Sequence, residues 1–471
     1  MGADFGLFGL GRIGGNLARN ALSKGMSVSL FDCDPALRSE IGSEFPASLE
    51  AFAADDESFA ASIGPPRVIL FTRAPGDAID GTIARFIPCL DPGDIVVDAG
   101  DSWFRDSERR ERDLASRGLR FVSLGISGGA EGVLQGPSLM AGGAPELRPI
   151  LLPILERLAA KGPDGQACAV WHGPAGAGHF VKMMHNAIEY ADMEILAESY
   201  NILKSSLRAS HREVKACFSK WERSEIASHL LSLSVDVLSK DEADGVPLID
   251  RILDRATQKG SGIRAIEYAL ELGVQASTLA EAVFARNLSM HKDERVTASA
   301  LLGEHVSRAS GSPSSLMEDV KKAALAAKII AYSEGFSLLS RASEAEGWAL
   351  DAVAVARGWR AGALIRGPFL DHVAEAYSST PDLPSLLHDA RMKIQLDQSL
   401  PALRRVVARA VETGLPIPLL TSAVSSFDGQ RSAWLPANLI QALRDRFGGH
   451  GFERVDRPRG EMHFASWGDG S

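Results

Sequence analysis

The sequence lacks the features of a secreted or membrane-spanning protein. Among 471 residues there are only four cysteines, and none of them forms a CxxC pair. We therefore expect neither a disulfide framework nor a zinc site, and this is typical of a reducing compartment. The N-terminus has no basic segment followed by an apolar run, and no stretch reaches the ~20 apolar residues of a membrane span. The sequence predicts a cytoplasmic protein with no membrane partner.

The sequence also has no excess of positive charge. It carries 60 acidic and 50 basic residues, which gives a net charge of −10. A surface of this sign resists nucleic acid as well as anionic membranes, so we expect no nucleic-acid partner. The length and the 45% hydrophobic content allow two to four domains of roughly 100–200 residues each.

Hydrophobic patterning divides the chain into parts of different character. In the first third, short apolar runs alternate with polar helical stretches, a rhythm typical of βαβ units in a mostly parallel sheet. The runs predict strands at residues 4–8, 27–31, 67–72, 95–99 and 119–124.

After about Gly178, long helical periods dominate, for example over residues 180–203 and 320–346. The last part predicts a short helix over 437–447 and then an irregular tail. The expected fold is therefore an α/β Rossmann-type domain over residues 1–177, a large all-α domain over 178–432, and a C-terminal tail over 433–471.

A glycine-rich motif follows the first predicted strand. Gly9-Leu10-Gly11-Arg12-Ile13-Gly14 has GxGxxG spacing and opens a helix, which is the context in which this motif binds a dinucleotide. Its glycines let the backbone approach a pyrophosphate at a helix N-terminus. A plain glycine-rich turn is the alternative.

Acidic residues after the second predicted strand bear on the identity of the dinucleotide. Asp32 stands where a carboxylate accepts hydrogen bonds from the adenosine ribose and repels a 2′-phosphate. Asp34 adds negative charge, and Arg38 is the only basic residue nearby in the sequence. We predict NAD rather than NADP, with a loop role for Asp32 as the alternative.

The most informative stretch is a polar stripe on one predicted helix. Counted from Lys182, the residues His185, Asn186, Glu189 and Tyr190 follow at i+3, i+4, i+7 and i+8 and share one face. The apolar residues between them are expected to point mostly away. A solvated face is the ordinary alternative, but this stripe carries five different functional groups. A lysine beside a glutamate suits acid–base chemistry if burial lowers the pKa of the lysine toward neutrality.

Further candidates are a glycine-rich segment and a set of separated cations. Segment 125–132 follows a predicted strand, and its backbone amides are suited either to hold a carboxylate or to form a tight turn. The cations are Lys259, Arg286, Arg444 and His450. Each of them, taken alone, is more often a surface charge.

Over nearly the whole chain, these motifs resemble the 6-phosphogluconate dehydrogenase family, and the tail resembles the family's long form. The resemblance rests on the N-terminal glycine motif and on Val97-Asp98-Ala99-Gly100-Asp101-Ser102, 125–132, 136–140, 176–186, Gln258-Lys259-Gly260, 281–286, 435–442 and 444–450.

The resemblance implies a role for each candidate. Lys182 would be the general base on the C3 hydroxyl of 6-phosphogluconate, and Glu189 the acid that protonates C1 of the enediol. The sugar acid would be held by Asp101, Ser127, Gly128, Gly129, His185 and Asn186, and its phosphate by Tyr190, Lys259 and Arg286. Arg444 and His450 would complete the phosphate site from the second subunit of a homodimer.

The resemblance also implies the cofactor site and the reaction. NAD, or NADP as the alternative, would be bound by Gly9, Leu10, Gly11, Arg12, Ile13, Gly14, Asp32, Cys33, Asp34, Thr72, Arg73, Ala74 and Asp101. The products would be ribulose 5-phosphate, CO2 and the reduced cofactor, as in the pentose phosphate pathway. No metal would be required, because the keto group formed at C3 is itself the electron sink.

Two positions depart from the family's pattern. The family usually ends its second strand with Asn-Arg-Thr, whereas this chain has Asp32-Cys33-Asp34, so the arginine that would meet a 2′-phosphate is absent. The family has Asn where this chain has Asp101. A carboxylate there would face an anionic substrate, unless it is protonated or paired or the substrate binds differently.

Two other functions remain open from the sequence. One is a β-hydroxyacid dehydrogenase for a related sugar acid, which the long tail and the separated cations disfavour. The other is a non-catalytic sensor of a dinucleotide or sugar phosphate, which the presence of both Lys182 and Glu189 disfavours.

Overall fold

The structure is a computed structural model that describes residues 2–45, 51–303 and 313–468. The chain divides into two compact units, Met1–Val424 and Ser425–Ser471. Within the described residues, no helix combines the length and the apolar character that crossing a membrane requires.

The first part of unit 1 is built on a seven-stranded sheet with the strand order β2-β1-β3-β4-β5-β6-β7. Neighbouring strands are parallel except β5 and β6, which run antiparallel. The predicted fold class, a mostly parallel sheet followed by a helical domain, is confirmed. The strands are β1 Phe5–Phe8, β2 Val28–Phe31, β3 Val68–Phe71, β4 Ile95–Asp98, β5 Arg120–Ser127, β6 Ser138–Gly143 and β7 Ala169–Trp171.

Strands β1 and β3, inside the sheet, carry only apolar residues and glycine because both faces of the sheet are covered. In β3, Val68 and Leu70 enter one hydrophobic cluster, whereas Ile69 and Phe71 enter a second cluster. Successive side chains of a strand point to opposite faces, so the two clusters lie on either side of the sheet. The helices that cover it are α1 Arg12–Ser23, α2 Pro35–Glu44, α3 Asp56–Ala61, α4 Asp77–Phe86, α5 Phe104–Ala115, α6 Gly129–Gln135 and α7 Arg148–Leu158.

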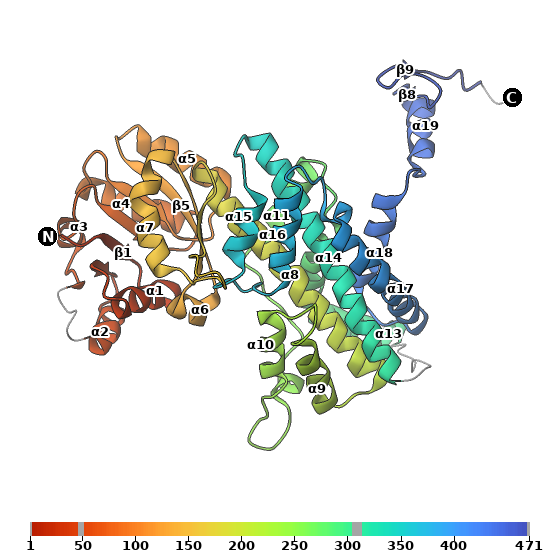
Figure 1. The fold of residues 1–471 in the computed structure, drawn as a ribbon, viewed down its shortest axis with the longest axis horizontal. Helices are drawn as coiled ribbons and strands as arrows, with labels where there is room; N and C mark the ends of the chain where they lie inside the picture. Colours follow the sequence, from red (N-terminus) through yellow and green to blue (C-terminus); the bar gives the residue numbers. More distant parts are fainter. Residues whose placement is uncertain (1, 46–50, 304–312, 469–471) are drawn as a thin grey trace. The chain divides into compact units, whose positions relative to one another are not determined.

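The remainder of unit 1 is helical and centres on two long helices. Helix α8, Ala175–Leu207, packs against strands β5 and β6 of the sheet and against α14, Pro313–Glu346, which in turn packs on α17 (Figure 1). The other helices are α9 His211–Trp221, α10 His229–Val237, α11 Ser261–Glu271, α12 Ser277–Met290, α13 Lys292–Leu302, α15 Ala352–Trp359, α16 Phe369–Ser379, α17 Ala390–Thr413 and α18 Pro418–Arg431, which ends in unit 2.

Unit 2 is more regular than the predicted irregular tail. It contains α19, Ala437–Gly448, and an antiparallel pair formed by β8, Phe452–Glu453, and β9, Met462–His463. The buried carboxylate of Asp445 organises these elements. It accepts hydrogen bonds from the backbone of Gly451 at 2.9 Å and from the indole of Trp467 at 2.6 Å. The expectation of an irregular tail is therefore wrong for these residues, because one carboxylate ties the segment after α19 back to that helix.

A buried ion pair fixes the loop that follows β4. Asp98 is 0% exposed and Arg110 of α5 is 2% exposed. Arg110 Nη1 donates to Asp98 Oδ2 at 3.1 Å, and the carboxylate also accepts from Ser102 Oγ at 2.7 Å and from the backbone of Gly100 at 3.0 Å. Because the aspartate sits between α5 and the turn at 100–102, it determines where that turn lies.

Replacing Arg110 should therefore destabilise the protein strongly. Arg110→Ala leaves the carboxylate of Asp98 buried without its counter-charge, and we expect a loss of about 3–5 kcal/mol in the free energy of unfolding. The matched control is Arg109→Ala, because Arg109 shares the partner Asp80 but lies 44% exposed, and its loss should stay below about 1 kcal/mol. Thermal unfolding compares the two variants, and equal losses would contradict this account.

Candidate active site

The carboxyl ends of the parallel strands β1 to β4 carry the predicted dinucleotide site. Gly9 has φ +95°, and a Cβ on Gly14 would lie 1.9 Å from the carbonyl oxygen of Gly9, so both positions require glycine. A Cβ on Gly11 would meet nothing within 4 Å. Helix α1 starts there without a side-chain cap, which leaves its first backbone N–H groups available to an anion. This geometry fits a pyrophosphate.

The carboxylate of Asp32 holds the backbone of the glycine loop by a hydrogen bond. Asp32 is 7% exposed and accepts hydrogen bonds from the backbone of Leu10 at 2.6 Å and of Asp34 at 2.9 Å. A carboxylate has about four acceptor sites, so this one retains capacity for ribose hydroxyls. Next to the loop, Thr72 Oγ1 donates to the carbonyl oxygen of Gly9 at 2.5 Å.

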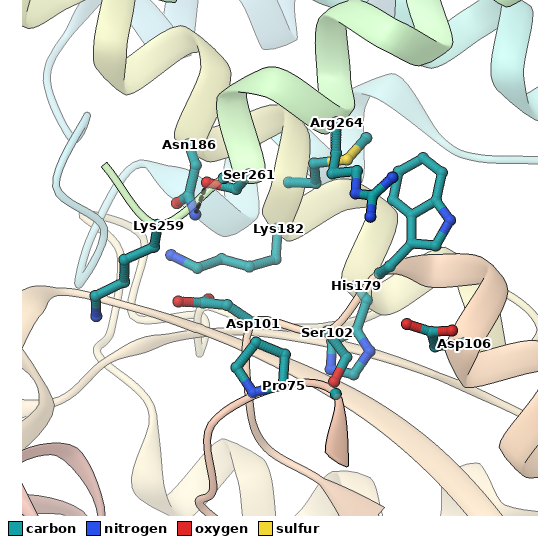
Figure 2. A pocket seen from close by; sticks show the side chains of 14 residues that line it. Pro75, Asp101, Ser102, Asp106, His179, Lys182, Asn186, Lys259, Ser261 and Arg264 are labelled. Carbon is teal, nitrogen blue, oxygen red and sulfur yellow. Dashed lines mark hydrogen bonds between the residues drawn. The ribbon is translucent and has the colours of Figure 1, made fainter. Parts of the chain in front are cut away.

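A cavity of about 330 Å³ opens between this edge of the sheet and the helical part of unit 1. Its volume lies in the range of small-molecule sites. Four predicted site residues line it, and Figure 2 shows their side chains around the same space: Asp101, Lys182, Asn186 and Lys259. Residues without a predicted role also line it, among them His179, Met183, Ser261, Trp103 and Arg264.

The polar stripe of α8 is buried, so its interpretation as a solvated helix face is wrong. Lys182 is 7%, His185 0% and Tyr190 8% exposed. The neighbouring Met183, expected to point mostly away, also lines the cavity. Because α8 lies in the cleft between the sheet and the other helices, the cavity covers a wider arc of the helix than one stripe.

Lys182 differs from the other buried lysine of this region. The ammonium of Lys328 binds both carboxylate oxygens of Asp192, at 2.8 and 2.7 Å. Lys182 Nζ, by contrast, has no hydrogen-bond or ion-pair partner among the described residues, and its side chain extends into the cavity (Figure 2). A sequestered charge without a structural partner is a typical mark of a functional group.

A chain of hydrogen bonds orients the middle of the stripe. Asn186 Nδ2 donates to Ser261 Oγ at 3.1 Å, so its Oδ1 faces His185 Nδ1 at 3.3 Å. Ser127 Oγ lies 2.9 Å from the other ring nitrogen. Burial, aided by the charge of Lys182, holds the pKa of His185 well below its usual value. The ring is therefore neutral, with its proton assigned to Nδ1 and with Nε2 accepting from Ser127.

Glu189 lies one turn further along α8. Its Oε2 is 3.6 Å from His185 Nδ1, and its side chain is 14% exposed. Burial raises the pKa of Glu189, although the positive charges of Lys182 and Arg286 oppose the shift. A carboxyl group in this setting holds a proton more readily than an ordinary glutamate, as a general acid must.

The other predicted phosphate ligands approach from two further segments. The guanidinium of Arg286, on α12, lies 3.9 Å from the ring centroid of Tyr190, and Lys259 lines the cavity just before α11. Tyr190 itself packs so closely on α11 that a Cβ on Gly262 would lie 2.8 Å from its ring. The remaining two ligands, Arg444 and His450, belong to unit 2, and their approach to a cavity stays a prediction.

Segment 125–132 splits into a strand end and a turn. Gly128 precedes α6 and Gly129 is its first residue, with φ +138° and +66°, whereas Gly125 lies inside β5. A Cβ on Gly125 would lie 2.3 Å from Lys182 Cβ, and one on Gly178 would lie 2.7 Å from the backbone of Gly142 in β6. These glycines permit α8 to rest directly on the strands, a role that the carboxylate-binding interpretation missed for Gly125.

Asp101 is exposed and has no hydrogen-bond or ion-pair partner within the described ranges, so the pairing expected as one possibility is not found. It stands on the turn after β4 that Asp98 fixes. In the same ranges, no group of three or more His, Cys, Asp or Glu residues is arranged to hold a metal ion.

Two residues that sequence reasoning overlooked connect the site. His179, 1% exposed, accepts at Nδ1 from Ser107 Oγ at 2.6 Å and donates from Nε2 to the carbonyl oxygen of Asp98 at 3.1 Å. It precedes Lys182 by three residues, so helical spacing already placed it on the stripe. Ser261 stands two residues after Lys259 and accepts a hydrogen bond from Asn186. For Trp103 and Arg264, whose contact joins distant segments, the sequence contained no signal.

Comparison with known families gives matches over nearly the whole chain. Residues 4–173 match the model of the NAD binding domain of 6-phosphogluconate dehydrogenase, and residues 178–467 match that of the C-terminal domain. The chain is 40% identical over 467 residues to the decarboxylating 6-phosphogluconate dehydrogenase of Haemophilus influenzae, covering 98% of this chain and 96% of the relative. It is 42% identical to the NADP(+)-dependent enzyme of Bacillus subtilis, over 96% and 97% of the two chains.

A solved structure agrees with these relatives. Plasmodium falciparum 6-phosphogluconate dehydrogenase, described in its apo form and in complexes with its cofactor NADP+ and its substrate 6-phosphogluconate, superposes with a TM-score of 0.93. The identity is 31%, and the match covers 98% of this chain and 100% of that one.

The contact between α8 and β5 makes a stability prediction. Gly125→Ala would force the Cβ atoms of residues 125 and 182 apart, and we expect overpacking to cost about 1–3 kcal/mol in the free energy of unfolding. Gly132→Ala, in helix α6 of the same segment, places a Cβ 3.6 Å from the carbonyl oxygen of Gly362 and should be neutral or stabilising by up to about 1 kcal/mol. Urea unfolding measures both, and a Gly125→Ala protein as stable as the Gly132→Ala protein would refute the packing argument.

Proposed function

Since the chain belongs to the 6-phosphogluconate dehydrogenase family, we propose that it oxidises 6-phosphogluconate with NAD as its preferred hydride acceptor. The chain is an NAD(P)-dependent oxidoreductase of the pentose phosphate pathway, and its reaction is the oxidative decarboxylation of 6-phosphogluconate to ribulose 5-phosphate and CO2. The observation that carries the residue assignment is the stripe of α8, on which Lys182 is buried, has no hydrogen-bond or ion-pair partner among the described residues, and extends into the cavity.

Lys182 is the proposed general base of the oxidation step. Bound NAD supplies a hydride acceptor at the nicotinamide ring. Lys182 takes the proton from the C3 hydroxyl while C3 loses its hydride, which leaves a 3-keto acid. This role is supported by the burial of Lys182, which is 7% exposed, and by the cavity that it lines together with Asp101.

Decarboxylation and protonation follow without a metal. The C3 carbonyl lies β to the carboxylate, so it accepts the electron pair of the breaking bond as CO2 leaves, and the protonated Lys182 donates to the carbonyl oxygen. Glu189, whose pKa is raised by burial, then protonates C1 of the enediol to give ribulose 5-phosphate.

The remaining site residues orient the sugar acid. We assign the carboxylate and hydroxyl contacts to Ser127, Gly128, Gly129, His185 and Asn186. Of these, Ser127, His185 and Asn186 belong to the hydrogen-bond chain of the site. Asp101, which lines the cavity from the turn after β4, is assigned to both the nicotinamide and the substrate. The phosphate is assigned to Tyr190, Lys259 and Arg286, of which the first and last form a cation–π pair.

The preference for NAD is supported by the charge at the end of β2. Asp32 points toward the glycine loop, and Cys33 and Asp34 are exposed where a ribose would lie. A 2′-phosphate would therefore meet carboxylates instead of the arginine found in the family's usual sequence. The Bacillus subtilis relative is named as NADP(+)-dependent, so this chain would differ from it in the choice of dinucleotide.

We further propose a cytoplasmic homodimer in which the tail completes the neighbouring active site. All four cysteines are free, as expected in a reducing compartment. Helix α19 exposes Leu439, Ile440, Leu443 and Phe447 by 53–75%, an apolar surface that a second subunit would cover. Arg444 lies on the same helix, and His450 follows it.

Steady-state kinetics test the cofactor preference. We expect a higher kcat/KM with NAD than with NADP. Asp32→Asn combined with Cys33→Arg should shift the ratio toward NADP by at least about tenfold, since a charge-assisted hydrogen bond is worth roughly 1.5–3 kcal/mol. Asparagine keeps an acceptor for the backbone of Leu10, so the glycine loop should survive. A parent protein that uses NADP more efficiently would remove the preference from the proposal.

Subunit mixing tests the role of the tail. Arg444→Ala and Lys182→Ala proteins should each be nearly inactive, because one lacks a phosphate ligand and the other lacks the base. If the tail crosses between subunits, a mixed dimer contains one intact site, so random exchange restores about one site in four. The control mixes the Arg444→Ala protein with a chain that carries both substitutions, which should restore nothing. No recovery in the first mixture would argue that the tail acts within its own subunit.

A further inference from the structure

A second arginine, distant in sequence, lies at the ribose end of the dinucleotide site. Arg85 comes from α4, and its Nη1 is 2.8 Å from Cys33 Sγ. Cys33 occupies the position of the arginine in the family's usual sequence. The guanidinium group that this chain lacks in the loop after β2 is therefore supplied to the same place by another helix.

Arg85 is held by a carboxylate. Its Nε and Nη2 donate to the two oxygens of Asp56, at 2.5 and 2.6 Å, in a bidentate pair. Asp56 begins helix α3, and its side chain is 20% exposed, against 44% for Arg85. The guanidinium also lies over the rings of Phe8 and Phe86, at 5.9 and 5.8 Å, so it packs on the aromatic side chains of this face as well.

The other arginine near this loop is also engaged. Arg38 lies over the ring of Phe31 at 5.4 Å and donates to the carbonyl oxygen of Ala54 at 3.2 Å. Of the two guanidinium groups, Arg85 is the one in contact with Cys33. The bidentate carboxylate occupies the fork of donors that a phosphate would use, and it adds a negative charge beside them.

We infer that Asp56 is a specificity-determining residue, which withholds Arg85 from the 2′-phosphate of NADP and so supports the choice of NAD. The inference rests on the proposed NAD preference and extends it from Asp32 to an ion pair between α3 and α4. Asp32 repels the phosphate directly, whereas Asp56 removes the cation that would otherwise bind it.

Binding of two adenosine probes tests this without turnover. The probes are 2′,5′-ADP, which carries the 2′-phosphate, and 5′-AMP, which lacks it. In Asp56→Ala, titration calorimetry should show a Kd for 2′,5′-ADP that is lower by about tenfold, equivalent to ~1.4 kcal/mol. The Kd for 5′-AMP should stay near the value of the parent protein. Asp56→Ala with Arg85→Ala should lose this gain, because the effect acts through the released guanidinium.

Two controls separate the possible outcomes. Glu57→Ala removes the same charge from the next residue of α3, and it should leave the ratio of the two Kd values near the parent's. An unchanged ratio in Asp56→Ala, an equal change in Glu57→Ala, or a gain that persists without Arg85 would each overturn the inference. A parent protein that prefers NADP in steady-state kinetics would refute the proposed cofactor preference. The effect of Asp56→Ala on the ratio of the two Kd values is measured independently of that result.

Discussion

The close approach of helix α8 to the sheet is the constraint on which the site depends. Gly125 and Gly142 on the strands and Gly178 on the helix leave no room for side chains between the two. Contact at this distance fixes the helix in height and rotation. It therefore brings the start of the polar stripe to the carboxyl edge of the sheet, where a dinucleotide binds. The sheet and the helical part of unit 1 are thus joined by α8, which packs closely against both.

The placement of charge follows from the same arrangement. Buried charges that support the fold are paired, as Asp98 is with Arg110, and Lys328 with Asp192. Lys182 is equally sequestered but has no such partner in the described part of the chain, and its side chain reaches the cavity instead. Burial also keeps His185 neutral. Residue type alone thus does not separate the proposed catalytic residues from those that stabilise the fold. The difference is whether a buried charge has a structural partner.

Sequence reasoning predicted what depends on local spacing. The glycine loop, five strands and the polar stripe follow from periodicities within one segment, and the resemblance to a family then supplied their roles. Contacts between distant segments were missed. The approach of Arg85 to Cys33 joins α4 to the loop after β2. The regular part of the tail depends on one buried carboxylate, that of Asp445. Strand β7 was also missed, because it has only three residues. His179 was missed although it precedes Lys182 by three residues and so shares the face of the stripe. Its role is a contact with the backbone of Asp98, which lies far away in the sequence.

We propose that Lys182, positioned by the contact of α8 with the sheet, is the base that takes the proton from the C3 hydroxyl of 6-phosphogluconate. A crystal structure of the dimer with NAD and 6-phosphogluconate bound measures this most directly. We expect the C3 hydroxyl within hydrogen-bonding distance of Lys182 Nζ, Glu189 beside C1 and C2, and the adenosine ribose on Asp32. A C3 hydroxyl that faces another base, with Lys182 turned away from the sugar, would contradict it.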